Sequence, residues 1–254
     1  MSASTADVQT PVTDEMVASY RRDGFVRVRG MVGRDEALAW GQTAQAFVAA
    51  HQDADHCKND IFSQHVNAWR EDPAMAAITR DPRIAAAATK LTGVPLRLWH
   101  DQILIKAPGK SVATELHQDQ PYWPHEHRPN PISMWIALCD VPVERGCMTF
   151  ISGSQQHNDL AAQDLSDAGS LMDMCPEMQW DQRVTVPLRA GDCTFHHGRC
   201  AHMATPNLTE DPRVAHVVIF IDADTLYDGT PHVVTDPLGL KAGDTLPDDV
   251  FPLA

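Results

Sequence analysis

Between Leu96 and Asp222 the chain is a series of short apolar runs separated by Gly, Pro and Asp residues. The runs cover residues 98–106, 133–141, 147–151, 184–188, 193–196 and 214–221. Short strands that alternate with turn-forming residues are typical of an antiparallel sandwich or jelly roll. Ala190-Gly191-Asp192 has the composition of a tight turn between two such strands. We therefore predict a mainly β chain whose core is a sandwich or jelly roll.

The first third of the chain carries helix signals instead. Thr13 is a good N-cap for a helix that Gly24 can end, and Asp81-Pro82 is a second helix start. We predict helices over residues 13–24, 35–50 and 81–93, with a short strand over residues 25–28 after the first helix. The fold class is therefore mainly β with flanking helices and a helical N-terminal third.

These patterns predict one domain over residues 1–254, since no repeat or low-complexity tract interrupts them. Its expected parts are a loose tail (1–12), a mainly helical support (13–95), the jelly-roll core (96–222) and a C-terminal wrap (223–254). Residues 158–182 interrupt the strand pattern, so we expect a long insertion over one mouth of the core. Its residues Met172, Met174 and Met178 either face a substrate or pack, as methionines more often do.

The charge balance narrows the class of partner. Twenty Lys and Arg against 34 Asp and Glu give a net charge of -14, which argues against a nucleic-acid or anionic-membrane surface. The six cysteines include no Cys-x-x-Cys pair, and neither a signal peptide nor a long apolar run is present. We expect a cytoplasmic protein with reduced thiols and a small-molecule substrate, either monomeric or dimeric.

His117 and Asp119 are the first candidates for chemistry. Two residues apart at a strand end, an imidazole and a carboxylate can lie on one side of the chain. With a second histidine they form the 2-His-1-carboxylate face that suits iron(II). His196, His197 and His202 are the three candidates for that second histidine. The spacing alone is more typical of a surface turn, so the order of the downstream residues decides the interpretation.

Arg213 opens a strongly apolar run, which is an unusual place for a charge unless the side chain points into the core. A buried arginine needs a partner, and the planar guanidinium fits a carboxylate. That carboxylate belongs either to a protein residue or to a bound acid. An ordered series of His-x-Asp, a distant His and then an Arg is hard to obtain by chance.

In these features the chain resembles the phytanoyl-CoA dioxygenase family of iron(II)- and 2-oxoglutarate-dependent oxygenases. The resemblance runs from about His65 to Ile221. It rests on Lys106-Ala107-Pro108-Gly109, His117-Gln118-Asp119, Pro121-Tyr122-Trp123-Pro124, Trp135, Gly146-Cys147, Gly153-Ser154, Gly191-Asp192, Phe195-His196, His202, Asn207 and Arg213. It implies a double-stranded β-helix, the cupin-like form of the jelly roll, with iron(II), 2-oxoglutarate and dioxygen as cofactor and co-substrates.

The resemblance also implies roles for single residues. His117, Asp119 and His202 would bind the iron, and Arg213 would bind the distal carboxylate of 2-oxoglutarate. Four further residues lie where family members contact the co-substrate; they are Gln118, Trp135, Gln102 and, more loosely aligned, His65. Ala204 departs from the family, which often has a serine there, so Thr205 either takes its place or leaves Arg213 with less help.

The implied reaction is hydroxylation of an unactivated carbon in a natural product or acyl-type substrate, with release of succinate and carbon dioxide. In halogenating relatives a small residue replaces the carboxylate, so Asp119 argues against chlorination. Epimerisation, desaturation and ring closure at the same centre stay open. So does a cupin-type metal-dependent hydrolase or isomerase, although Arg213 argues against it. A non-catalytic binding module would not need the complete set of ligands.

A second metal site at His125 and His127 is less expected than a polar loop, and Lys106 and Lys110 are either substrate-attracting or solvated strand-end charges.

Overall fold

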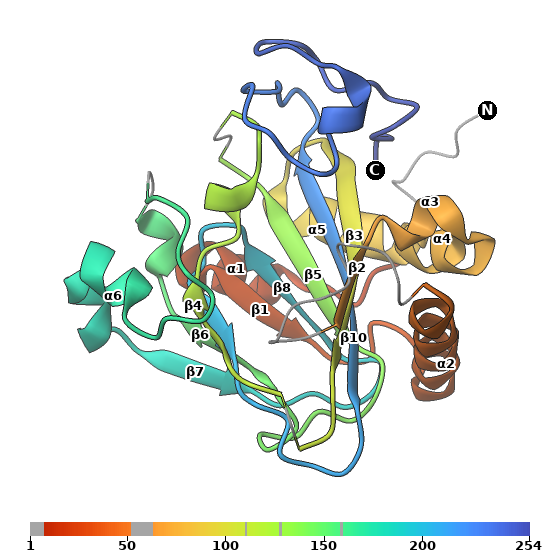
Figure 1. The fold of residues 1–254 in the computed structure, drawn as a ribbon, viewed down its shortest axis with the longest axis vertical. Helices are drawn as coiled ribbons and strands as arrows, with labels where there is room; N and C mark the ends of the chain where they lie inside the picture. The colour runs from red at the N-terminus through yellow and green to blue at the C-terminus, as the bar shows by residue number, and fades with distance from the viewer. Residues whose placement is uncertain (1–7, 52–62, 110, 127–128, 158–159) are drawn as a thin grey trace.

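Two antiparallel sheets face each other and enclose the core of the barrel (Figure 1). The computed structural model describes residues 8–51, 63–109, 111–126, 129–157 and 160–254. The larger sheet has the order β1 (Phe25–Val28), β8 (Cys193–His197), β5 (Ile132–Ala137), β10 (Arg213–Asp222), β3 (Leu96–Lys106) and β2 (Ser63–Val66). The smaller sheet has the order β4 (Thr114–His117), β9 (His202–Ala204), β6 (Met148–Ile151) and β7 (Arg183–Val186). The predicted jelly roll is confirmed.

Strand β10 is the centre of the larger sheet and is buried along its whole length. Side chains alternate across a strand, so Ala215, Val217 and Ile219 face the space between the sheets, whereas Val214 and Val218 pack against the helices. Because both faces are covered, the strand reads as a continuous apolar run. Arg213 is on the inward-facing set, at the start of the strand.

Several helices cover the outer face of the larger sheet, and the first and last of them begin and end at the predicted capping residues. They are α1 (Asp14–Asp23), α2 (Arg34–Ala50), α3 (Ala68–Glu71), α4 (Pro73–Thr79) and α5 (Pro82–Thr92). The Thr13 hydroxyl accepts a hydrogen bond from the Met16 amide, and Gly24 ends α1 with a φ of 81°. Asp81 caps α5 in the same way. Satisfying the free amides of a first turn stabilises a helix by about 1 kcal/mol.

The predicted helical first third is confirmed, and it also supplies two strands to the larger sheet. Strand β1 was predicted, but β2 was not, and these two strands form the edges of the larger sheet. The four residues of β2 pair with β3. A strand of this length has too few residues for a clear alternation of apolar and polar positions.

The turn at Gly191 holds β8 against the N-terminal region. Gly191 has a φ of 91°, and a Cβ atom there would lie 2.5 Å from the carbonyl oxygen of Val32. The Asp192 carboxylate also accepts a hydrogen bond from the Gly30 amide. Glycine is required at this turn by both backbone conformation and space.

The described part of the insertion, residues 160–182, contains two short helices, α6 (Ser170–Met174) and η5 (Pro176–Trp180). Met178 is fully buried in a small apolar cluster with Leu171 and Leu116, so it packs. The segment 223–254 crosses one end of the barrel (Figure 1) and pairs with it through the Arg97–Leu253 bridge.

The predictions for residues 1–7, for the irregular segment 52–62, and for Lys110, His127 and residues 158–159 fall outside the described residues. In the part of the chain that the structure describes, no helix is long and apolar enough to cross a membrane.

Candidate metal centre and anion pocket

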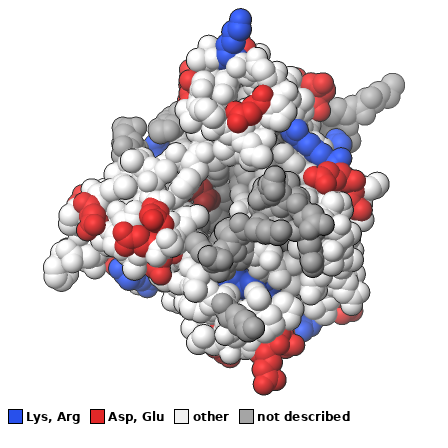
Figure 2. Space-filling view, viewed as in Figure 1, with Lys and Arg blue, Asp and Glu red and all other residues white. Residues whose placement is uncertain are grey.

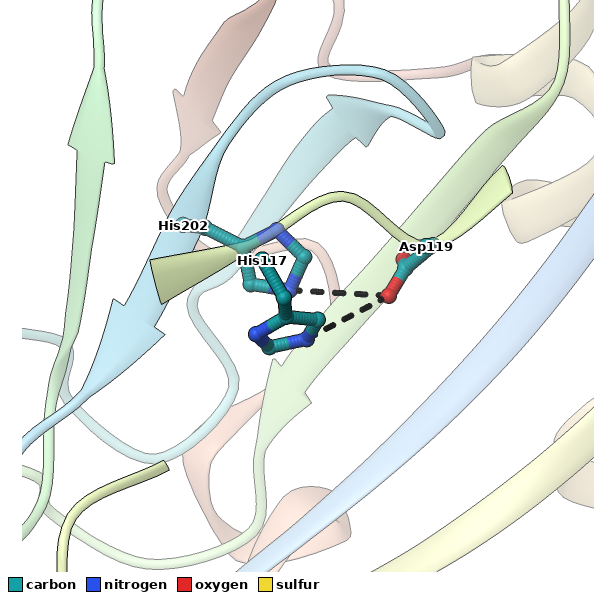
Figure 3. A group of neighbouring side chains, drawn as sticks. All are labelled: His117, Asp119 and His202. Atoms are coloured by element: carbon teal, nitrogen blue, oxygen red, sulfur yellow. Dashed lines mark ion pairs between the residues drawn. The ribbon is translucent and has the colours of Figure 1, made fainter. Parts of the chain in front are cut away.

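The side chains of His117, Asp119 and His202 converge at one mouth of the barrel (Figure 3). The Nε2 atoms of His117 and His202 each lie 3.6 Å from Oδ1 of Asp119. His117 ends β4, Asp119 follows in the next turn, and His202 begins the neighbouring strand β9. The β4–β9 pairing places His117 directly opposite His202. Two segments 85 residues apart (202 − 117) therefore supply one site.

Backbone hydrogen bonds fix the orientation of both imidazoles. Nδ1 of His117 lies 2.7 Å from the Glu115 carbonyl oxygen, and Nδ1 of His202 lies 2.9 Å from the Cys200 carbonyl oxygen. A carbonyl only accepts, so each Nδ1 carries the proton and each Nε2 presents its lone pair towards Asp119. Metal-binding histidines are commonly held in this way.

The three ligand atoms fit a first-row metal ion. Ligand-to-metal distances of about 2.1 Å put neighbouring ligands roughly 3.0 to 3.4 Å apart, and the two measured separations are 3.6 Å. A small inward movement of the rings would complete coordination. The donor set of two imidazoles and one carboxylate leaves further coordination positions open, as in non-haem iron(II) sites.

Burial and neighbouring groups set the protonation states of the ligands. Burial opposes ionisation of Asp119, but the neighbouring rings of His202, His117 and His196 outweigh it and hold the pKa of Asp119 well below its usual range. Burial, and then His117, lower the pKa of His202 to about 3. A carboxylate beside a neutral imidazole is the state that binds a metal.

The other two histidine candidates have different roles. His196 lies within 3.2 Å of Oδ2 of Asp119, and the Ser133 hydroxyl donates to the same oxygen at 3.1 Å. The ring of His197 contacts the Pro129 carbonyl oxygen through Nε2, at 2.7 Å. Only His202 therefore joins the group of three, while His196 and Ser133 orient the carboxylate from behind.

A cavity of about 70 Å³ leads inward from the metal ligands. Asp119, His196 and His202 lie at one part of its wall, and Arg213, Trp135 and Gln102 at another. The prediction that Arg213 points into the core is confirmed, because the side chain is 1% exposed. The cavity therefore contains both the candidate ligands and a buried cation.

Arg213 has an incomplete set of partners. Its guanidinium carbon lies 5.3 Å from the centre of the Trp135 ring, but Nε and Nη1 have no hydrogen-bond partner among the described residues. Burial lowers the pKa of Arg213 to about 10, which leaves it charged at neutral pH. An unpaired buried guanidinium is costly, and a carboxylate is the group that its geometry accepts.

Lys106 strengthens the positive potential at this end of the cavity. It pairs with Arg213 across β3 and β10 and is fully buried. Its ammonium donates to the carbonyl oxygens of Val112 and Ala204. Burial, and then Arg213, lower the pKa of Lys106 to about 7. The interpretation of Lys106 as a solvated strand-end charge is therefore wrong, and its attraction for an anionic ligand stays a prediction.

Three of the predicted co-substrate contacts lie in other surroundings. The Gln118 amide donates to the carbonyl oxygens of His157 and Arg199, at 2.9 and 2.7 Å. His65 pairs with Ile103, on the sheet face that packs against α2, and lies 3.1 Å from a Glu71 oxygen. The Thr205 hydroxyl donates to the Val143 carbonyl oxygen. The structure does not bring these three side chains to the cavity that Arg213 lines.

The sequence did not single out Ser133 as part of the site, and it offered Lys106 only as a substrate-attracting or solvated charge. Ser133 opens a predicted strand, and only the pairing of β5 with β8 places it beside His196. The signal for Lys106 was its position inside an apolar run, which is the same signal that identified Arg213.

The family model for phytanoyl-CoA dioxygenase (PhyH) matches residues 20–215 of this chain. Among curated proteins, the chain is 28% identical to phytanoyl-CoA dioxygenase domain-containing protein 1 of Rattus norvegicus over 159 residues, which are 60% of this chain and 54% of that protein. The chain thus spans about half the length of the rat relative. The protein of the same name from Danio rerio is 26% identical, with 82% of this chain and 89% of that protein aligned.

Solved structures give a longer match. The chain is 32% identical to SnoK, titled a non-heme alpha ketoglutarate dependent carbocyclase from nogalamycin biosynthesis, with a TM-score of 0.86 over 99% of this chain and 98% of SnoK. It is 35% identical to SnoN, titled an epimerase from the same biosynthesis, with a TM-score of 0.79 over 94% of this chain and 97% of SnoN. A match over residues 20–215 that includes the convergent ligands and Arg213 means that the chain belongs to the phytanoyl-CoA dioxygenase (PhyH) family.

Proposed function

We propose that this protein is an iron(II)- and 2-oxoglutarate-dependent oxygenase that oxidises a carbon–hydrogen bond of a small organic molecule. The observation that carries the proposal is the buried Arg213, which has two unpaired donors in the cavity that Asp119 and His202 also line. A hydrolase or isomerase with the same ligands has no use for a buried guanidinium there. SnoN has been crystallised in complex with Fe3+, alpha ketoglutarate and nogalamycin RO.

In this proposal His117, Asp119 and His202 hold the iron, which supplies the redox chemistry when bound. Arg213 binds the distal carboxylate of 2-oxoglutarate, and Lys106 adds positive potential behind it. Two like charges facing each other across a ladder destabilise the fold, so a bound dianion relieves a repulsion as well as pairing the guanidinium. Trp135 and Gln102 line the cavity between Arg213 and the ligands and position the keto acid.

His196 and Ser133 keep the Asp119 carboxylate turned towards the metal. A ligand that is held by its neighbours does not have to be ordered when the metal binds, so metal affinity depends on them. Buried walls around the cavity keep bulk water away from the reacting carbon.

The substrate in this proposal is a free small molecule of secondary metabolism. SnoK and SnoN both belong to the biosynthesis of one natural product. In Figure 2 the described Lys and Arg side chains of the visible face lie in separate places and form no continuous basic surface of the kind that the phosphates of coenzyme A would favour.

Hydroxylation is the first candidate outcome, because Asp119 completes the ligand set. Ring closure or epimerisation is the second, and a specific observation favours it: two solved relatives above 30% identity, SnoK and SnoN, are a carbocyclase and an epimerase. These outcomes differ in product mass, which is one oxygen atom higher after hydroxylation, two hydrogens lower after ring closure, and unchanged after epimerisation.

The test is anaerobic addition of iron(II) and 2-oxoglutarate to the metal-free protein. We expect a weak visible charge-transfer band when both are present, and succinate release when oxygen is admitted. Folded protein without the band, or zinc that replaces iron with retention of activity, would overturn the proposal. Natural-product substrates are then screened by succinate release, and the product mass distinguishes the outcomes.

A further inference from the structure

A second group of metal-binding side chains lies outside the cavity. His157 follows the short helix η4 (Ser154–Gln156), whereas Cys175 and Glu177 lie at the junction of α6 and η5 in the insertion. The ligand atoms of the three side chains all lie within 4.8 Å of one another. Sγ of Cys175 is 3.4 Å from Nδ1 of His157, and the same nitrogen is 3.8 Å from Oε1 of Glu177.

The distance between Cys175 and His157 matches that between two ligands of a tetrahedral zinc ion, and the exposed Glu177 side chain has to move by about 0.5 Å to complete the set. Zinc–sulfur and zinc–nitrogen bonds of about 2.3 and 2.0 Å separate the two ligand atoms by roughly 3.5 Å. A thiolate, an imidazole and a carboxylate are also the three ligand types that zinc accepts together. Thiolate favours zinc over iron(II), and so does the general order of metal affinities.

Burial of the three residues differs in a way that suits a partly open site. Cys175 is 3% exposed and belongs to the small apolar cluster with Leu171 and Met178. The side chains of His157 and Glu177 are 31% and 64% exposed. Solvent can therefore reach the fourth coordination position, and a water molecule would complete the tetrahedron.

We propose that His157, Cys175 and Glu177 form a zinc(II) site that links the insertion to the barrel. We call this three-residue site the clip. Zinc replaces the proton of the Cys175 thiol, and that proton goes to solvent. Because a thiol must lose its proton to bind zinc, occupancy of the site should increase with pH.

A single hydrogen bond connects the clip to the turn that carries the proposed iron ligands His117 and Asp119. The His157 carbonyl oxygen accepts from the side chain of Gln118, which stands between His117 and Asp119 in the chain. Residues 160–182 also contact this turn, because the Gln163 side-chain oxygen accepts a hydrogen bond from the backbone amide of Gln118. Zinc at the clip therefore stabilises the turn that carries two of the ligands.

The experiment uses cobalt(II) as a probe in the reduced, metal-free, full-length protein. The proposed iron site has no sulfur ligand, so a thiolate-to-cobalt charge-transfer band in the near ultraviolet reports the clip alone. We expect this band in the wild type and in His202→Ala, which removes an iron ligand, and we expect zinc to displace it. Cys175→Ser should abolish the band.

Cys139→Ser and Cys57→Ser are the matched controls, and both should keep the band. Glu177→Gln changes an exposed side chain, so it tests the clip even if Cys175→Ser does not fold, and we expect cobalt affinity to fall at least tenfold. The proposal is overturned if the wild type gives no band, if the band survives in Cys175→Ser, or if Glu177→Gln binds with unchanged affinity. Saturation only at millimolar cobalt would indicate an adventitious ion only and would overturn it as well.

Discussion

Replacing Arg213 with methionine separates the two effects that its guanidinium has in the proposed enzyme. Methionine keeps an unbranched chain in the cavity but removes the charge and all five donors. In the chain without co-substrate, Nε and Nη1 have no partner among the described residues. The substitution therefore removes unpaired buried donors that destabilise the protein without 2-oxoglutarate. It also removes the hydrogen bonds that would bind the co-substrate.

The magnitudes follow from this geometry. Each unsatisfied buried donor costs about 1 to 3 kcal/mol, and the lost contact with the Trp135 ring offsets about 0.5 to 2 kcal/mol of the gain. With two such donors, the free energy of unfolding without co-substrate should therefore rise by about 0 to 5 kcal/mol and should not fall. Two charge-assisted hydrogen bonds to a carboxylate contribute about 3 to 5 kcal/mol, so the Kd for 2-oxoglutarate should increase roughly 100-fold to several-thousand-fold.

The assay is urea unfolding of the anaerobic iron(II) protein with and without 2-oxoglutarate. At a concentration 100 times its Kd, the co-substrate should stabilise the wild type by about 2.7 kcal/mol. At the same concentration it should leave Arg213→Met unchanged. Arg34→Met is the control, because Arg34 is an exposed arginine paired with Asp140, and such a pair contributes about 0 to 1 kcal/mol.

Two results would refute the reasoning. If Arg213→Met kept the stabilisation by 2-oxoglutarate, the keto acid would have to bind elsewhere. If the variant without co-substrate unfolded several kcal/mol more easily than the wild type, the guanidinium would have a partner in the protein, and the case for an anion site would fall. Arg213→Lys should lie between the two proteins, because it keeps the charge and loses the planar fork.

Three further predictions concern the surroundings of the site. Ser133→Ala removes one hydrogen bond from Asp119 and should lower metal affinity roughly tenfold; an unchanged affinity in a metal titration would contradict the orienting role. Gly191→Ala forces a side chain into a left-handed turn 2.5 Å from the Val32 carbonyl oxygen and should lower the free energy of unfolding by about 2 to 4 kcal/mol, as measured with urea. Burial raises the pKa of Asp101 from 3.8 to about 7, so between about pH 4 and 7 the folded chain keeps a proton that the unfolded chain has lost, and this group lowers stability as pH rises. Asp101→Asn removes that dependence, so its free energy of unfolding should fall less than that of the wild type between pH 5 and 8; parallel pH profiles would show that Asp101 ionises normally.

The sequence alone determined the features that depend on local spacing. Thr13, Gly24, Asp81 and Gly93 marked helix ends correctly, because caps act within one turn. The apolar run of β10 was visible because a strand with both faces covered has no polar positions. Arg213 was conspicuous for the same reason, and the order of His117, Asp119, His202 and Arg213 was sufficient to identify the family.

Tertiary structure decided which side chains share a face and which groups are left without partners. The residues alone left three histidines within seven residues as candidate ligands, and the family resemblance favoured His202. The pairing of β9 with β4 places His202 opposite His117, while β8 turns His196 towards the far oxygen of Asp119. Gln118 lies between two ligands in the chain, yet alternation along the backbone directs its amide to the carbonyl oxygens behind the site. His157 and Cys175 are 18 residues apart, with no pattern to link them. Such contacts depend on strand pairing and loop closure between distant segments, and residue type and spacing do not specify these interactions.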